Sequence, residues 1–342
     1  MSNGNDRKFF TAACDADAEK LLSEVLNEMR NSLDGTGLCV VLGGSYGRGD
    51  GGVRLDRENG ILYNDLDFFV FARKKVPGAG NMLKNIAEKY EHELKVDVDF
   101  SRIMTLKDIK NNAPRLMMQE LKRGYVHVCG EDLLIRYLPA IPAEFLPFSE
   151  ACRLLVNRGM GLLFAGEKIA NDSGEADFIL RNIYKAILGA GDAMLISHGT
   201  YRWKISERLT LIEKSDMPEC WKQLYREAVE FKHTPHRKLK PDMVSFWQSA
   251  RDLFQGAALN CAGVQKASDL REGIFDRCRQ CGEISLMNYI KYGVKTRSIP
   301  LKGGYYYTMP AVAVMAGEVF AALNEMPEKI DEKLYQRWLI FN

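Results

Sequence analysis

Apolar residues recur at three- and four-residue steps between residues 15 and 33, and this spacing predicts an amphipathic helix. The run Leu38–Leu42 is wholly apolar and predicts a short buried strand. Further strands are expected over residues 65–71, 95–100 and 125–130, and further helices over residues 82–92 and 106–121. Such alternation of strands with helices is typical of an α/β domain.

The pattern changes after Pro147, where helical spacing dominates and indicates a helical bundle. Residues 263–310 are less regular, with strand packing expected at Tyr305–Tyr307, and residues 232–238 are expected to form a solvated basic loop. We therefore predict two domains, residues 1–145 and residues 146–342. The helices expected in the second domain cover about residues 149–169, 175–198, 203–214, 218–231, 241–259, 311–325 and 329–339.

Composition narrows the class of protein. Apolar residues make up 46% of the chain and charged residues 27%, which excludes a disordered or collagen-like protein. The net charge of +2 gives no electrostatic footprint for nucleic acid. The start of the sequence has no apolar leader, and we expect neither a membrane span nor a secreted protein but a cytoplasmic one.

Eight cysteines are spread along the chain and are expected to be reduced thiols, mostly in the core. Cys278 and Cys281 have the spacing of half a zinc site, but no second pair stands at a suitable distance in the sequence. Their role stays open.

Carboxylates begin two of the predicted strands. Asp65 and Asp67 precede an apolar run, and Asp97 and Asp99 alternate with apolar residues. Because residues i and i+2 of a strand point to the same face, each pair shares a face. If the two strands are neighbours, the carboxylates converge and repel, which raises their pKa values. A divalent cation relieves that repulsion, and these hard oxygen ligands suit Mg²⁺.

A glycine turn supplies a site for anions. Gly43, Gly44 and Ser45 directly follow the strand Leu38–Leu42. Glycines let backbone N–H groups approach an anion closely, and the serine hydroxyl adds a donor. Carboxylates beside such a turn fit a magnesium nucleotide. The turn lacks the lysine of a P-loop.

The order Leu42-Gly43-Gly44-Ser45, Asp65-Leu66-Asp67 and Val96-Asp97-Val98 resembles the motifs hG[GS], Dh[DE]h and h[DE]h of the DNA polymerase β-like nucleotidyltransferases. The motifs lie within residues 15–135, and the helices after Pro147 resemble the bundle that follows the catalytic domain in aminoglycoside nucleotidyltransferases. The resemblance implies an α/β (α+β) catalytic domain with a mixed sheet and a helical acceptor-binding domain.

The resemblance also implies an activity. A nucleoside monophosphate, with AMP the expected group, would pass from a nucleoside triphosphate such as ATP to a hydroxyl of a small molecule or protein, with release of pyrophosphate. Two Mg²⁺ ions would be held by Asp65, Asp67 and a third carboxylate. For that third position Asp97 is favoured by its motif, whereas Asp99 fits the spacing nearly as well. Gly43, Gly44 and Ser45 would bind the phosphates.

Other residues are candidate nucleotide ligands. The separation of Ser45 from Asp65 is longer than the family shows, and a hairpin over residues 53–63 with its tip at Glu58-Asn59-Gly60 accounts for the excess. Arg48 lies where this insertion can aim it at the nucleotide. Arg181 and Lys185 stand one turn apart on a predicted helix and can reach a triphosphate, although a solvated helix face also explains them.

Two alternatives remain open. One is a non-catalytic nucleotide sensor or a toxin–antitoxin-type regulatory protein, which would bind nucleotide without releasing pyrophosphate. The other is synthesis of a nucleotide second messenger or modification of an RNA end. The sequence does not identify the acceptor, the preferred base or the oligomeric state.

Overall fold

The chain forms two compact units in the computed structural model, which describes residues 9–54, 60–297 and 304–341. The first unit, here called the sheet unit, comprises Met1–Ile141 together with Glu230–His236. The second, the helical unit, comprises Pro142–Val229 and Arg237–Asn342. The sheet unit therefore includes a segment that the sequence places well beyond its predicted end at residue 145.

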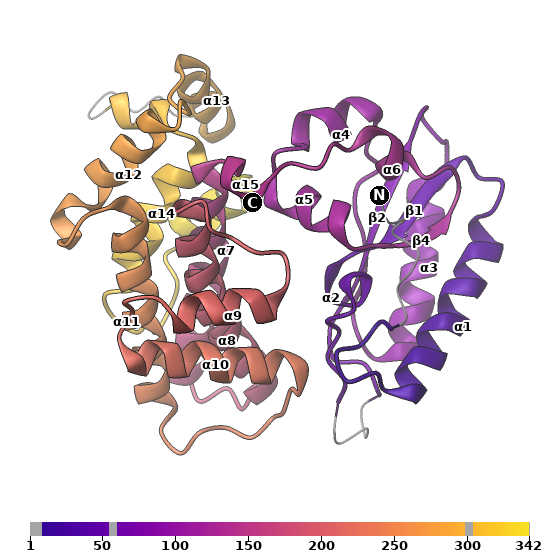
Figure 1. Cartoon of the computed structure of the whole chain (residues 1–342), viewed down its shortest axis with the longest axis horizontal. Helices are drawn as coiled ribbons and strands as arrows, with labels where there is room; N and C mark the ends of the chain where they lie inside the picture. The colour runs from indigo at the N-terminus through magenta and orange to yellow at the C-terminus, as the bar shows by residue number, and fades with distance from the viewer. Residues whose placement is uncertain (1–8, 55–59, 298–303, 342) are drawn as a thin grey trace. The chain divides into compact units, whose positions relative to one another are not determined.

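Four strands make a mixed sheet in the order β3-β2-β1-β4 (Figure 1). The central strand β1 is antiparallel to both β2 and β4, whereas β2 and β3 run parallel. The sheet unit is thus mixed α/β, as the alternating pattern predicts. The strands span Leu38–Leu42 (β1), Leu66–Ala72 (β2), Val98–Phe100 (β3) and Val126–Cys129 (β4).

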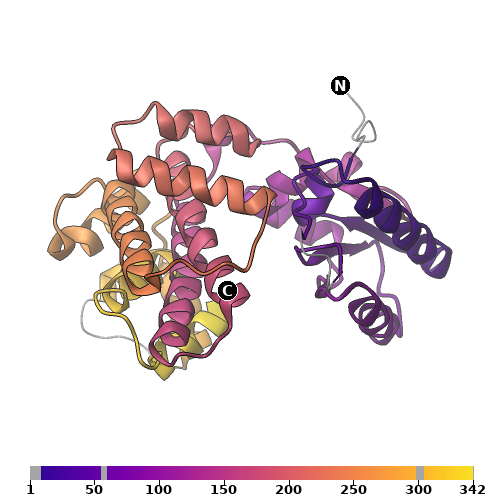
Figure 2. The ribbon, with the colours of Figure 1, turned by 90° about the horizontal axis from the view of Figure 1, so that it is seen from below.

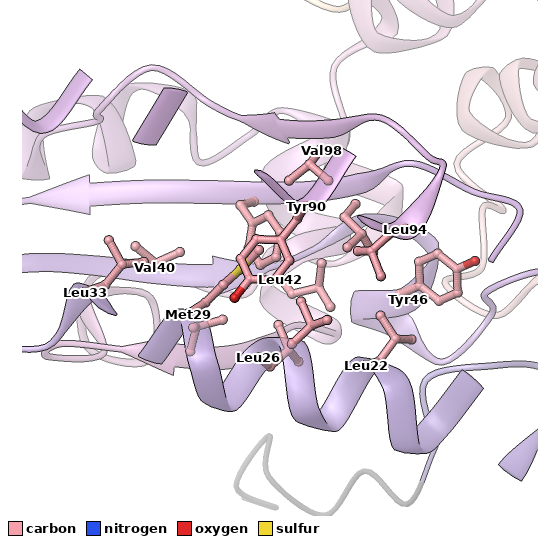
Figure 3. Packing of buried hydrophobic residues seen from close by; sticks show 14 of the residues in the cluster. Leu22, Leu26, Met29, Leu33, Val40, Leu42, Tyr46, Tyr90, Leu94 and Val98 are labelled. Carbon is pink, nitrogen blue, oxygen red and sulfur yellow. The ribbon is translucent and has the colours of Figure 1, made fainter. Parts of the chain in front are cut away.

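Helices α1 (Ala16–Leu33) and α3 (Ala79–Leu94) pack on one face of this sheet. Side chains of α1 at helical spacing, among them Leu22, Leu26 and Met29, point toward β1, as Figure 3 shows. Because strand residues alternate in direction, every second residue of β1 and β2 faces these helices. On the two strands these are Leu38, Val40, Leu42, Leu66, Phe68, Val70 and Ala72.

Three shorter helices cover part of the opposite face: α4 (Leu106–Asn112), α5 (Leu116–Arg123) and α6 (Leu133–Tyr137). The sequence predicts one helix over residues 106–121, and this prediction is wrong. Pro114 separates α4 from α5 because proline lacks the N–H that a helix interior needs.

The segment between β1 and β2 begins with a short helix, α2 (Gly44–Arg48). The predicted hairpin is present as an antiparallel bridge between Val53 and Leu62. Residues 58 and 59 of its expected tip lie outside the described residues.

The helical unit is built around α7 (Phe148–Ala170) and α8 (Ala176–Ser197), which lie side by side (Figure 2). Helices α11 (Met243–Ala262) and α14 (Ala311–Ala322) pack against this pair. Between and after them lie η1 (Ala143–Phe145), α9 (Ile205–Glu213), α10 (Glu219–His233), η2 (Ala267–Asp269), α12 (Leu270–Gln280), α13 (Leu286–Thr296), η3 (Gly304–Thr308) and α15 (Glu332–Phe341).

Two parts of this unit differ from expectation. The region predicted to be irregular contains α12 and α13. Tyr305–Tyr307 lie in the 3₁₀ helix η3 rather than in a strand. In addition, α10 continues to His233, so the first part of the expected basic loop is helical, and Phe231 packs edge-on against Tyr63 within the sheet unit.

A buried polar network fixes α9 and α10 to α8. The Asp192 carboxylate lies 2.9 Å from the Arg208 Nε atom and accepts a hydrogen bond from the Tyr225 hydroxyl. Because a buried arginine needs an anionic partner, Asp192 is a structural residue here.

All eight cysteines are free thiols, and five of them are buried, as predicted: Cys39, Cys129, Cys152, Cys261 and Cys278. Within the described part of the chain, each helix is too short or too polar to cross a bilayer.

Candidate functional site

The C-terminal end of β1 and the N-terminal ends of β2 and β3 meet at the same edge of the sheet. Leu42, the last residue of β1, stands opposite Phe68 of β2. The Gly43 N–H then donates a 2.8 Å hydrogen bond to the Asp67 carbonyl. The glycine turn therefore leaves the sheet directly beside the acidic start of β2.

The same edge brings carboxylates of two strands together. Asp67 and Asp99 are register partners in the parallel pair β2–β3. Side chains of register partners project from the same face of a sheet. The Leu66 N–H donates to the Asp97 carbonyl at 2.9 Å, so the pairing extends one residue beyond the strands. Asp65 and Asp67 therefore stand beside Asp97 and Asp99.

Burial shows which way these residues point. Leu66, Phe68 and Val98 are buried against α1 and α3. The residues that alternate with them are less buried. Asp65 and Asp67 are half-buried, and Asp97 and Asp99 are exposed. The four carboxylates thus lie on the sheet face opposite α1 and α3, the face that α4, α5 and α6 cover only in part.

Like charge at this edge affects Asp99. Burial raises the pKa of its carboxyl, and the neighbouring charges of Asp65, Asp97 and Glu91 raise it further. This is the mutual repulsion expected of convergent carboxylates.

Gly44 lies against the Asp67 carboxylate. Its φ of +58° is in the left-handed region, and a Cβ atom there would stand 2.0 Å from Asp67 Oδ2. Glycine is therefore required at this position for two reasons, its backbone conformation and the closeness of Asp67. Ser45, half-buried, follows in the first turn of α2.

Tyr46 is a positioning residue that sequence reasoning missed. It is fully buried in the sheet-unit core (Figure 3), and its hydroxyl donates to the Gly52 carbonyl at 2.8 Å. The same oxygen accepts N–H bonds from Tyr63 at 3.0 Å and Asn64 at 3.3 Å. Tyr46 thereby connects α2 to the residues just before Asp65. An aromatic residue amid glycines was the available signal.

Arg48 is held by acidic neighbours. Its Nη1 atom lies 3.2 Å from a Glu120 oxygen on α5, and its Nε atom lies 4.0 Å from Asp50. Lys232, at the end of α10, lies 3.5 Å from the same Asp50 carboxylate. The structure thus places Arg48 at the far end of α2 from Gly44, and its contact with a nucleotide stays a prediction.

The other two predicted cations belong to the helical unit. Arg181 and Lys185 lie on α8, and both are half-buried. Their role as nucleotide ligands also stays a prediction.

Among residues 9–54, 60–297 and 304–341, no three His, Cys, Asp or Glu side chains form a group that could hold a metal ion. The register pair of Asp67 and Asp99 still fits Mg²⁺, because proteins commonly bind this ion through one or two carboxylates and leave further positions to water and substrate phosphates. Both residues offer the hard oxygen ligands that the ion requires.

Comparison with known proteins identifies no relative. No family model matches the chain, no curated protein matches it, and no solved structure matches it.

Proposed function

We propose that the chain is a Mg²⁺-dependent nucleotidyltransferase that transfers a nucleoside monophosphate from a nucleoside triphosphate to an acceptor hydroxyl. The expected group is AMP. One observation carries the proposal: Gly44 lies against the Asp67 carboxylate at the sheet edge where Asp67 is paired with Asp99. A phosphate cradle and a pair of acidic ligands are thereby adjacent. The acceptor is a small molecule or a protein.

Each residue has a role in this proposal. Asp67 and Asp99 would hold Mg²⁺, with Asp65 as a further candidate ligand. Gly43, Gly44 and Ser45 would hold the β- and γ-phosphates through backbone N–H groups and the serine hydroxyl. When bound, Mg²⁺ would neutralise the negative charge that develops on the phosphates during transfer. Arg48, Arg181 and Lys185 are further candidates for phosphate contacts.

For the third carboxylate we favour Asp99 over Asp97. Asp99 is the register partner of Asp67, the carboxylate against which Gly44 lies. A carboxylate at this position can accept the proton of the attacking hydroxyl.

In the proposed step, the acceptor oxygen forms a bond to the α-phosphorus while the bond from that phosphorus to the α,β-bridging oxygen breaks. Pyrophosphate leaves with the bond electrons, and the hydroxyl proton passes to the Asp99 carboxylate. The product is the acceptor's phosphodiester with the nucleoside.

The test uses ATP labelled at its α-phosphate and measures, in the presence of Mg²⁺, how fast the label is transferred to candidate acceptors. Asp99→Asn should lower the rate of transfer by about 10²-fold or more, the contribution typical of a general base. Asp97→Asn should lower it less. Asp216→Asn, an exposed aspartate of the helical unit, is the matched control and should transfer label at the wild-type rate.

The outcomes separate the candidates. Equal rates for Asp99→Asn and wild type would exclude Asp99 as the base. Nucleotide binding without any transfer or pyrophosphate release would instead favour the nucleotide sensor.

A further inference from the structure

A cavity lies wholly within the helical unit and is lined by residues of α12 and α14. Figure 1 labels these two helices. The cavity has a volume of about 360 Å³, within the range of roughly 300–1,000 Å³ that small-molecule sites occupy. Ala267 of η2, Tyr307 of η3, Met309 and Asn324 complete its wall. The cavity is independent of the carboxylate site and of the function proposed for it.

Most of the cavity wall is apolar. The lining includes Leu270 and Ile274 from α12, Met309 after η3, and Val314 and Phe320 from α14. Each of these side chains is also nearly covered by protein. Such a wall favours a ligand with an apolar body, since its transfer from water is favourable in proportion to the area covered.

A fixed cation lies on the same wall. The Arg271 guanidinium carbon stands 4.0 Å from the centre of the Tyr306 ring and 5.8 Å from that of Tyr307. Tyr306 is itself anchored, because its hydroxyl donates a 2.5 Å hydrogen bond to Glu272. A guanidinium whose face rests on a ring keeps its N–H groups at the edge, where they match a carboxylate. Arg271 is exposed and so lies at the cavity's opening.

The acidic residue of the lining does not cancel this cation. Glu318 lies 3.1 Å from Arg337, which does not line the cavity. Burial raises the pKa of Glu318, and Arg337 and Arg271 lower it to a lesser degree. Glu318 thus has its ion pair with a residue outside the lining, and Arg271 is the cation that the lining itself contributes.

Gly317 leaves the side of α14 that borders the cavity open. It lies in the interior of α14, where glycine is less favourable than alanine. Beyond the backbone of its own helix, no described atom lies within 4 Å of a Cβ built on it. By contrast, a Cβ on Gly159 of α7 would meet Val319 at 2.4 Å and Phe254 at 2.8 Å, so that glycine is explained by packing. The open side of Gly317 faces the cavity that it lines.

We propose that this cavity binds a small amphipathic anion whose apolar body lies against α12 and α14 and whose single carboxylate-like group is held by Arg271. An anion follows from the guanidinium that stands at the cavity's opening. A small apolar body follows from the volume and the wall.

The test uses the full chain and the fluorescent probe 1-anilinonaphthalene-8-sulfonate, an aromatic monoanion. We expect saturable enhancement of its fluorescence at one site per chain. Octanoate should displace the probe, whereas octylamine, which has the same apolar body and the opposite charge, should not. Arg271→Met should weaken probe binding about 10-fold or more, because a charge-assisted hydrogen bond is lost. Gly317→Leu should abolish binding by filling the cavity.

Arg279→Met is the matched control. Arg279 also lies on α12, is exposed and does not line the cavity, so this variant should bind the probe as the wild type does. Absence of saturable binding to the folded wild type would overturn the proposal, as would equal displacement by octylamine or unchanged binding by Arg271→Met. If Gly317→Leu does not fold, Arg271→Met and the octanoate–octylamine pair still decide.

Discussion

Among single residues, Gly44 does what no other amino acid can do at its position. It combines a left-handed backbone with a place in the turn where any Cβ atom would stand 2.0 Å from Asp67 Oδ2. The first property alone is common to many turn glycines, and the second is specific to the candidate site. Alanine substitutions at Gly44 and at a left-handed glycine outside the site therefore distinguish the effect of backbone strain from that of the contact with Asp67.

Gly44→Ala should reduce pyrophosphate release by about 10²-fold, since displacement of a catalytic group by roughly 1 Å can cost that much. The control is Gly35→Ala. Gly35 has a φ of +72°, but no described atom lies within 4 Å of its Cβ position. Both variants should lose about 1–2 kcal/mol of stability from the left-handed backbone. Full activity in Gly44→Ala, measured by initial rates, would contradict the proposed contact.

The raised pKa of Asp99 has a consequence for stability. Its folded-state pKa lies above the ordinary value of 3.8, so the folded state holds this proton more tightly than the unfolded state does. Stability therefore falls as pH rises from 3.8 through the raised pKa, and the loss persists at neutral pH. Asp99→Asn should accordingly have a higher melting temperature than wild type at pH 7, with the difference shrinking on acidification.

Asp108 is the control of opposite sign. Its hydrogen bonds from Arg102 and Thr105 hold the pKa of its carboxyl below the ordinary value. That stabilisation is present above the ordinary pKa and is lost as pH falls. Asp108→Asn should lower the melting temperature at pH 7, and again the difference should shrink in acid. The same sign for both variants would show that the carboxylates at the sheet edge do not repel.

Among the elements, α2 is short, and its placement depends on Tyr46. One buried hydroxyl serves three backbone groups, at Gly52, Tyr63 and Asn64. The segment that carries Asp65 into the sheet thus rests on a side chain of the helix that follows the glycine turn.

Tyr46→Phe should destabilise the sheet unit by about 1–3 kcal/mol, because buried backbone groups lose their partner. Denaturant titration measures this loss. Tyr90→Phe is the comparison. The Tyr90 ring is buried too, but among the described residues its hydroxyl bonds to the exposed side chains of Glu28 and Lys89 rather than to the backbone. An equal loss in the two variants would refute a special role for Tyr46.

In the helical unit, the ion pair between Asp192 of α8 and Arg208 of α9 leads to a separate prediction. Asp192→Ala leaves Arg208 buried, with a side chain only 7% exposed, and without its carboxylate. We expect a loss of about 3–5 kcal/mol, as for other broken buried pairs. Glu213→Ala, which removes an exposed partner of Arg226, should cost about 1 kcal/mol or less. Similar losses in denaturant titration would contradict the structural role of Asp192.

Across the whole molecule, local patterns predict elements well where one physical cause dominates. The run Leu38–Leu42 is a strand with the predicted bounds because all five residues are apolar and buried. The spacing of α1 succeeds for the same reason. By contrast, α12 is polar overall and escapes prediction, since only a narrow side of it is buried, at Leu270, Gly273, Ile274 and Cys278.

The candidate site could be predicted only in part. Alternation along a strand is enough to place Asp65 with Asp67 and Asp97 with Asp99. It does not reveal that β3 pairs with β2, nor that Asp99 stands opposite Asp67, because strand order and register depend on the whole sheet. The contact of Gly44 with Asp67, and that of Phe231 with Tyr63, are long-range and leave no local signal.

The most direct test of the proposed nucleotidyltransferase activity measures the release of pyrophosphate from ATP in the presence of Mg²⁺ and candidate acceptors. The wild-type chain is compared with Asp67→Asn. We predict steady release by the wild type and a loss of about 10²-fold or more in the variant, while Asp216→Asn retains the wild-type rate. Release at the same rate by Asp67→Asn, or none from a wild-type chain that binds the nucleotide, would refute the proposed activity.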